Sequence, residues 1–184
     1  MIQHLVQQVA QDVPEAPLLT IREMLSRVAR ELCTEADVWV QRDQPVVVAA
    51  NTPYPQIMAS QGEALRIISL TINGREYAQG EGFRQLSPAE IEFDRQPSES
   101  LIYGALACRP EMGQAAPDEV LARWGEVIAD GARWRLLLLP QPWRDTELAP
   151  YYQQRYLAGV TDAKQHSRLG HARGGARVNM RRFI

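Results

Sequence analysis

The apolar side chains of this chain change period from helical to alternating spacing, and then return to helical spacing. In residues 18–36 they recur every three or four positions, as on one face of an amphipathic helix: Ile21, Met24, Leu25, Val28, Leu32 and Ala36. The opposite face is charged, with Arg22, Glu23, Arg27, Arg30 and Glu31. Pro17 suits the first turn of a helix. The pattern predicts a helix over 18–36 that packs on a core.

Residues 37–112 show the alternation and turn signals of β-strands. The strongest signal is the run Ile67–Ile72, which is followed by Asn73-Gly74 and then by Arg75–Tyr77. Because Asn and Gly both tolerate positive φ, this pair predicts a tight type I′ hairpin. A second strand is expected from Ser100 to Cys108, with Leu101, Tyr103, Ala105 and Ala107 on one side. The segment Ser87–Glu90 fits either a helix start or a turn.

Helical spacing returns at Pro117. Val120, Leu121, Trp124, Val127 and Ile128 predict one helix, which we expect Gly131 to break or bend before Ala132–Leu139 continues. A last helix is expected from about Pro150 to Ser167. The sequence therefore predicts an α+β fold. Residues 1–36 and 113–168 form a helical bundle, residues 37–112 are an inserted small antiparallel β-sheet, and residues 169–184 are an extended basic C-terminal tail.

Charge is unevenly distributed along the chain. The formal net charge of the 184 residues is only −2, but the six basic residues from Lys164 onward are accompanied by no acidic side chain. Residues 1–163 hold 14 of the 20 basic and all 22 acidic side chains, which gives −8. The length suits one compact domain. We expect no export, because Met1-Ile2-Gln3-His4 lacks the charged and apolar regions of a secretory signal, and no membrane partner.

Motifs for known chemistry are missing from the sequence. It contains no GxxxxGK[ST], GxGxxG after a strand, HExxH or GxSxG pattern, so we expect neither an enzyme nor a cofactor. Cys33 and Cys108 are isolated and are expected to be buried free thiols. His166 and His171 lack the further ligands that a metal site would need. The carboxylates of Glu90, Glu92 and Asp94 are expected to be solvated surface.

Aromatic residues gather in the C-terminal half: Trp124, Trp134, Trp143, Tyr151, Tyr152 and Tyr156. They fit a helical core, and they also fit a subunit interface, because Trp, Tyr and Arg are enriched at interfaces. For the interface, the candidates are Trp134, Trp143 and Tyr151.

The tail combines apolar and basic residues. Its candidate partner-binding residues are Arg173, Arg177, Val178, Met180, Arg181, Arg182, Phe183 and Ile184. A solvated, disordered end is one interpretation. The other is a segment that adds to a partner's sheet edge or fills its groove, because large apolar residues favour burial.

Several segments together resemble one protein family. They are Ile21-Arg22, Ala29–Cys33 and Trp39, then Gly131–Arg133 leading to Leu136–Trp143, then Leu148–Gly159, and finally Arg177-Val178 to Arg181–Ile184. This series is similar to the head-to-tail adaptor proteins of tailed bacteriophages, related to the tail tubular protein A group. It spans nearly the whole chain in order.

The resemblance implies a structural virion protein at the head–tail interface, assembled in the host cytoplasm. Such adaptors form a ring, usually of twelve subunits, beneath the portal protein. The ring extends the DNA channel, which DNA crosses without specific binding, and carries the downstream tail or nozzle protein. The tail from Arg173 to Ile184 would dock on the portal or on a neighbouring subunit. The hairpin at Asn73 and Gly74 would face the next component of the phage tail.

The charge distribution also suggests an alternative function. The basic tail could bind phosphates, which would make the chain a nucleic-acid-binding accessory protein. Six charges without an aromatic stacking platform predict weak, salt-sensitive binding, so a protein partner is favoured.

Overall fold

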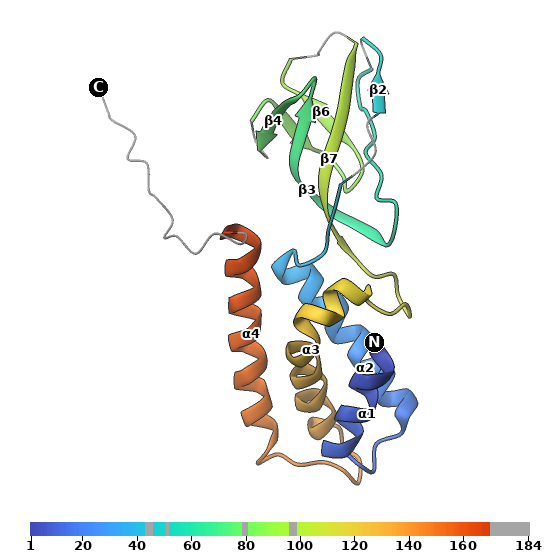
Figure 1. Cartoon of the computed structure of the whole chain (residues 1–184), viewed down its shortest axis with the longest axis vertical. Coiled ribbons are helices and arrows are strands. Elements are labelled where there is room, and N and C mark those ends of the chain that lie inside the picture. Colours follow the sequence, from blue (N-terminus) through green and yellow to red (C-terminus); the bar gives the residue numbers. More distant parts are fainter. Residues whose placement is uncertain (43–45, 51, 79–80, 96–98, 170–184) are drawn as a thin grey trace, which may run out of the picture.

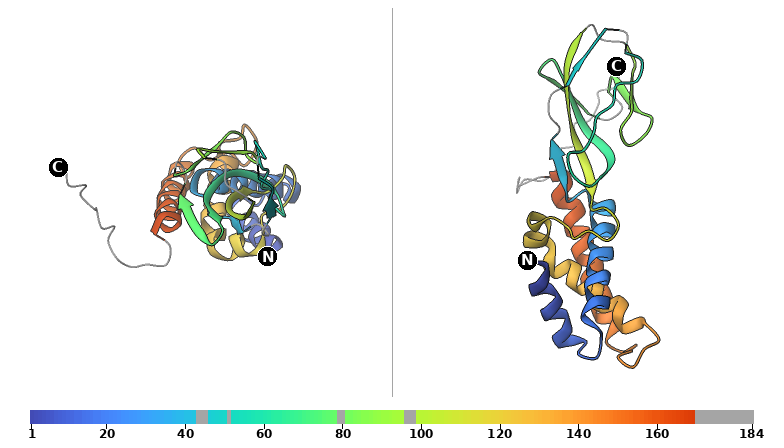
Figure 2. Two further views of the ribbon diagram at one scale, coloured as in Figure 1. Left: turned by 90° about the horizontal axis from the view of Figure 1, so that it is seen from above. Right: turned by 90° about the vertical axis from the view of Figure 1, so that its right-hand side faces the viewer.

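The computed structural model describes residues 1–42, 46–50, 52–78, 81–95 and 99–169. It is an α+β fold, with four helices and a small antiparallel sheet. The helices lie at one end of an elongated molecule and the strands at the other (Figures 1 and 2). The predicted tail, residues 170–184, lies outside the described residues together with all its candidate partner-binding residues.

Four helices form the bundle: α1 (Ile2–Asp12), α2 (Leu18–Ala36), α3 (Asp118–Leu138) and α4 (Ala149–Leu169). The structure confirms the predicted helix over 18–36 and the predicted last helix. Helix α3 lies in the middle of the bundle, with α4 on one side and α1 and α2 on the other (Figure 1).

Helix α1 was not predicted. Its apolar residues do recur at helical spacing, and Leu5 and Val9 are buried. Polar glutamine side chains lie between them, so the segment is amphipathic and the spacing of Ile2, Leu5, Val6 and Val9 could have predicted it. Helix α1 is stabilised by packing on α3, where Leu5 contacts Gly125.

The expected break at Gly131 is wrong, since α3 runs through it without interruption. A Cβ atom on Gly131 would lie 2.6 Å from Val28 Cγ1 and 2.7 Å from Tyr156 Cδ2. Gly131 therefore permits close packing of α2, α3 and α4, and this outweighs the weak helix propensity of glycine.

The main sheet has strand order β1-β7-β3-β4, and β2 also pairs with β7. Its strands are β1 (Val40–Arg42), β2 (Val46–Val48), β3 (Glu63–Ile72), β4 (Arg75–Ala78) and β7 (Ser100–Arg109). All described pairings are antiparallel, as predicted. Irregularities in the β3–β7 register between Ala64 and Arg66, and between Ile67 and Ser69, locally shift which residues face each other.

A second, two-stranded sheet, β5 (Phe83–Gln85) and β6 (Ile91–Phe93), was not predicted. Its buried residues Phe83 and Ile91 belong to the same core as Ile67, Leu70 and Leu106 of the main sheet. The opposite side of β7, which carries Leu101, Tyr103 and Ala105, is more exposed. Ser87–Glu90 is a turn between the two short strands, where the Ser87 hydroxyl accepts from the Glu90 N–H.

Candidate interaction surfaces

The predicted hairpin is present between β3 and β4. Ile72 pairs with Arg75 across a two-residue turn in which Asn73 and Gly74 have φ of 50° and 84°. Asn73 also ties the turn to β7, because its Oδ1 accepts from the Leu101 N–H at 2.9 Å and its own N–H donates to the Leu101 carbonyl at 2.9 Å. Both turn residues are exposed, so the turn is a fixed projection that a partner could contact.

The aromatic residues divide between core and surface. Trp124 and Tyr156 are buried, while Trp134 and Trp143 are partly buried. The Trp143 indole N–H donates to the Leu136 carbonyl at 3.2 Å, so it caps the end of α3. Of the three interface candidates, Tyr151 is the exposed one, with 53% of its surface accessible.

A network of buried charges crosses the bundle. Asp130 accepts from Arg133 and from Arg155, each at 2.8 Å, and Arg133 also donates to Asp12 at 2.7 Å. Asp130 and Arg133 are only 3% and 5% exposed. The network joins α1, α3 and α4. The hydrogen bond to Tyr151, followed by the hydrogen bond to Asp130 and the charge of that carboxylate, raises the pKa of Arg155, so this side chain stays charged.

A second polar contact joins three helices at Glu31. Arg135 donates to both carboxylate oxygens of Glu31, at 2.6 and 2.7 Å, and the Tyr156 hydroxyl lies 3.4 Å from one of them. Burial and the Glu31 charge raise the pKa of Tyr156 to about 12. The tyrosine therefore stays a neutral donor to Glu31.

Sequence reasoning placed Arg30 and Glu31 on a charged outer face and missed both of these networks. Asp12 lies 121 residues away from Arg133 along the chain, and Glu31 lies 104 residues away from Arg135. The one signal present in the sequence is a set of arginines inside an otherwise apolar helix. Such residues are rarely buried unless paired.

Charged side chains also join the bundle to the sheet. The carboxylate of Glu63, on β3, forms ion pairs with two arginines. Its Oε2 lies 2.8 Å from Nη2 of Arg30 in α2 and 2.9 Å from Nη2 of Arg109 in β7. Hydrogen bonds from the two guanidinium groups lower the pKa of Glu63 from 4.5 to about 2. Arg30 additionally donates to the Pro110 carbonyl.

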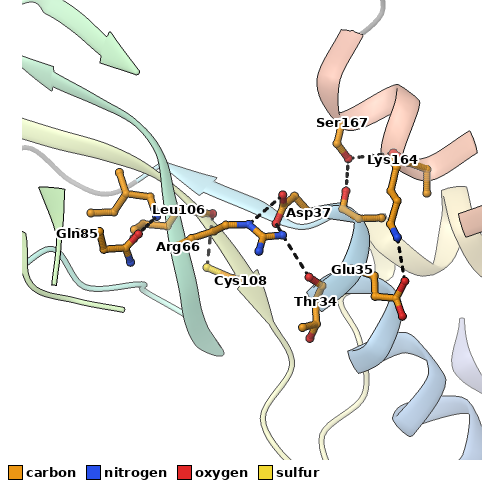
Figure 3. Close-up of polar contacts among 12 residues, drawn as sticks. Thr34, Glu35, Asp37, Arg66, Gln85, Leu106, Cys108, Lys164 and Ser167 are labelled. Atoms are coloured by element: carbon orange, nitrogen blue, oxygen red, sulfur yellow. Dashed lines mark hydrogen bonds and ion pairs between the residues drawn. The ribbon is translucent and has the colours of Figure 1, made fainter. Parts of the chain in front are cut away.

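Figure 3 shows the other side of this junction. Arg66 of β3 pairs with Asp37 at 2.6 Å and donates to the Thr34 carbonyl at 3.2 Å. Asp37 ends α2 in a left-handed conformation, with φ of 50°. On α4, Lys164 pairs with Glu35 at 3.0 Å, and the Ser167 hydroxyl donates to the Ala36 carbonyl. The end of α4 is therefore fixed to the end of α2, close to the junction with the sheet.

Exposed apolar residues gather at the start of α2. Leu18, Leu19 and Met112 are 61%, 67% and 83% exposed. Two adjoining grooves of about 720 and 390 Å³ share Leu19 and Arg22 as lining residues. We call this combined surface the α2 furrow; its apolar lining residues are Leu18, Leu19 and Met112, and its charged lining residues are Arg22, Glu23, Arg27, Arg30 and Glu111. This surface was not predicted, because Arg22, Glu23 and Arg27 have the spacing of an ordinary charged outer face of a helix.

The remaining candidates for chemistry are structural in the described part of the chain. Cys33 and Cys108 are free and fully buried, as predicted, and burial raises the pKa of these thiols to about 12 and about 11. The His166 ring packs against Trp124 in a tilted arrangement, with centroids 6.0 Å apart, and its Nδ1 lies 3.1 Å from the Arg123 guanidinium. His171 lies outside the described residues.

Among the described residues, no group of three or more histidine, cysteine, aspartate and glutamate side chains is placed to hold a metal ion. None of the helices there has both the length and the apolar character needed to cross a bilayer.

The chain was also compared with known proteins. No family model and no curated protein matches it. What bears on its function is the set of surfaces described above and the resemblance of its sequence segments to head-to-tail adaptor proteins.

Proposed function

We propose that this chain is a subunit of a bacteriophage head-to-tail adaptor, which forms a ring beneath the portal and joins the capsid vertex to the tail. One observation carries the proposal. Three segments of the resemblance, far apart in the sequence, meet at Tyr156, which lies in Leu148–Gly159. Its hydroxyl lies 3.4 Å from Glu31 of the segment Ala29–Cys33, and its ring packs against Gly131 of the segment Gly131–Arg133. The resembling segments therefore pack against one another in one helical bundle, although they are far apart in the sequence.

The shape of the molecule supports this function. A ring subunit that joins two different partners needs two dissimilar ends, and this chain has a helical bundle at one end and a sheet at the other (Figure 2). The hairpin at Asn73 and Gly74 is the candidate contact for the downstream tail protein. The tail residues 173–184 are the candidate contact for the portal or for a neighbouring subunit.

Charge supports the same function. Residues 1–163 carry a net charge of −8, and several of their arginines are neutralised by carboxylates in the bundle and at the junction. A channel wall with little free positive charge does not hold a passing polyanion. The proposed ring would therefore let DNA pass without specific binding.

The test is assembly with a portal. Purified chain mixed with portal rings should add a second ring layer in negative-stain images. Deletion of residues 173–184 should abolish this layer while the far-ultraviolet circular dichroism of the bundle and sheet stays unchanged. If the deleted chain docks as the full chain does, the role of the tail is wrong. If the full chain adds no layer to any portal ring, the adaptor function is wrong.

A matched variant separates this function from nucleic-acid binding. Changing Arg173, Arg177, Arg181 and Arg182 to glutamine keeps the apolar residues of the tail but removes its charge. An adaptor tail anchored by Val178, Met180 and Phe183 should retain most of its docking. A nucleic-acid-binding tail should lose its DNA affinity, which should also fall steeply with salt in the unchanged chain.

A further inference from the structure

The side of the main sheet that faces away from β5 and β6 is apolar along β7. An antiparallel sheet with one solvated side normally carries polar residues on that side. On β7 these outward positions are instead Leu101, Tyr103, Ala105 and Ala107. We call this side the outer sheet face; beside β7 it also carries Val40 and Arg42 of β1, Val47 of β2, Ser69 and Thr71 of β3, and Glu76 of β4.

Much of the outer sheet face is exposed. Val40, Val47 and Leu101 are 44%, 64% and 44% exposed, whereas Ala107, at the end nearest the bundle, is already buried. A hollow of about 180 Å³ lies on the face beside the partly buried Tyr103. Clusters of large exposed apolar side chains usually mark an interaction site.

We propose that residues 170–184 of the same chain cover the outer sheet face. The first support is the place where helix α4 ends. Arg66 pairs with Ala107 across β3 and β7, so its side chain lies on the same side of the sheet as the outer sheet face. Arg66 forms an ion pair with Asp37 (Figure 3), and the groove beside them is also lined by Ser167 and Arg168 of α4. Residues 170–184 therefore follow α4 directly at the base of this face.

The length of these residues fits the path along the sheet. From Ala107 to Leu101 the face extends over six residues of β7, which is about 20 Å at 3.4 Å per residue. Val178 is nine residues beyond Leu169 and Ile184 is fifteen, so an extended chain places them up to about 30 and 50 Å away. The segment from Val178 to Ile184 can therefore reach the far end of the face without full extension.

The composition of the segment suits an apolar surface. Val178, Met180, Phe183 and Ile184 are large apolar side chains, and their burial offsets the cost of ordering the segment. Tethering adds to this, because a short flexible link holds a segment near its site at a roughly millimolar effective concentration. These two terms favour the chain's own segment over a second copy.

Charge does not decide the contact. Arg42 and Glu76 are exposed on the outer sheet face and cancel each other, and at its base the arginines of β3 and β7 are held in ion pairs. Exposed Arg168 adds a positive charge at the base, just before residues that are themselves basic. We therefore expect the arginines of the segment to stay in water while its apolar side chains make the contact.

The consequence for assembly rests on the proposed function. Residues 173–184 cannot cover their own sheet and bind the portal or a neighbouring subunit at the same time. The contact would therefore hold them back until a partner competes for them. The contact itself is a property of the single chain and is tested without a portal.

Cross-linking within one chain tests the contact. The variant carries Arg42→Cys on the outer sheet face and Asn179→Cys in the segment, and the native thiols stay silent because both are fully buried. A short bifunctional thiol reagent at low protein concentration should join the two, and peptide mass spectrometry measures the yield. Arg95→Cys with Asn179→Cys is the matched control, because Arg95 is also exposed but lines a hollow with Ile72 and Tyr77 on the other side of the sheet.

The Arg42 pair should give at least about tenfold more cross-linked monomer than the Arg95 pair. Equal yields from the two pairs overturn the proposal. A product that joins two chains and increases with protein concentration also overturns it, because the segment would then cover the face of a second copy.

Removing apolar surface tests what holds the segment. In the Arg42 pair, Val47→Thr and Leu101→Thr together should lower the yield at least about fivefold, because threonine keeps the preference for a strand but removes apolar surface. Leu86→Thr is the matched control, at a leucine that is 51% exposed just after β5, and it should leave the yield unchanged. Circular dichroism checks that each variant is folded. A yield that stays the same in the folded double variant overturns the proposal.

Failure of this contact is distinguishable from failure of the adaptor function. A chain that adds a layer to portal rings but gives equal yields for the Arg42 and Arg95 pairs is an adaptor that lacks the contact. A chain that shows the contact but never binds a portal covers its sheet as inferred and has another function.

Discussion

At the scale of single residues, the spacing of the bundle depends on the missing side chain of Gly131. Val28 and Tyr156 approach so closely that an added Cβ would lie within 2.6 and 2.7 Å of their side-chain atoms. Ordinary non-bonded carbon atoms do not come so near, so one methyl group would force α2 or α4 away from α3.

The first prediction follows from this contact. Gly131→Ala should lower the free energy of unfolding by about 1–3 kcal/mol through overpacking, although alanine favours helix. The matched control is Gly125→Ala in the same helix, where the new Cβ would lie 3.3 Å from Leu5. It should remain within about 1 kcal/mol of the unchanged protein. Urea titration followed by circular dichroism measures both, and an equal effect at the two positions would contradict the packing argument.

The second prediction concerns the buried charges. Asp130→Ala removes the carboxylate shared by Arg133 and Arg155 and leaves the buried Arg133 with Asp12 alone. We expect a loss of about 3 kcal/mol in the free energy of unfolding, as for other buried ion pairs that lose one partner. Asp118→Ala is the control on the same helix. Asp118 is 77% exposed in its ion pair with the N-terminus, so its loss should cost less than about 1 kcal/mol.

At the scale of elements, local patterns predicted most of what is present. The bounds of α2, the Asn73-Gly74 hairpin and the strand from Ser100 follow from spacing and turn chemistry, which act over a few residues. The strands β5 and β6 have three residues each, too few for a period to emerge. The strand order and the two register shifts between β3 and β7 depend on partners distant in sequence, which no local pattern encodes.

The candidate surfaces were less predictable than the elements. The hairpin was found because its turn needs particular residues. The furrow was missed because its arginines and glutamate look like ordinary solvated positions. Only the fold brings Met112, from the loop after β7, beside Leu19 at the start of α2.

The third prediction belongs to the junction between the bundle and the sheet. The pKa of Glu63 is lowered to about 2, so its ion pairs stabilise the fold fully above its ordinary pKa of 4.5. This contribution is lost as the pH falls from about 4.5 to about 2. The difference in free energy of unfolding between the unchanged chain and Glu63→Gln should be constant near neutral pH and should shrink over that window. Arg109→Gln leaves Arg30 as the partner, so in that background the loss should still begin near pH 4.5 but should be smaller and should end at a higher pH. A difference that does not change with pH would contradict the ion-pair assignment.

At the scale of the whole molecule, the question is whether the bundle and the sheet unfold together. The backbone crosses between them near Trp39, which is buried and whose carbonyl accepts from the Cys108 N–H at 2.8 Å. The same ring lies against Gly62, where an added Cβ would come within 2.6 Å of it. With the ion pairs of Glu63 and Arg66, these contacts join α2 to β3 and β7. Such contacts would hold the two ends of the proposed adaptor subunit at a fixed separation.

The last prediction uses the two native thiols as reporters of the two parts. Cys33 lies in α2 and Cys108 in β7, both fully buried, and their raised pKa values keep them protonated. A thiol reagent should therefore modify each only after unfolding. In the single-thiol variants Cys33→Ala and Cys108→Ala, the remaining thiol should become reactive over the same range of urea concentration as the loss of circular dichroism, once each variant's own stability is taken into account. Thr161→Cys, exposed on α4, should react at once in the absence of urea and serves as the control for the reagent. Modification of Cys108 well before the helical signal is lost would mean that the sheet opens independently, and the fixed separation of the two ends would then be wrong.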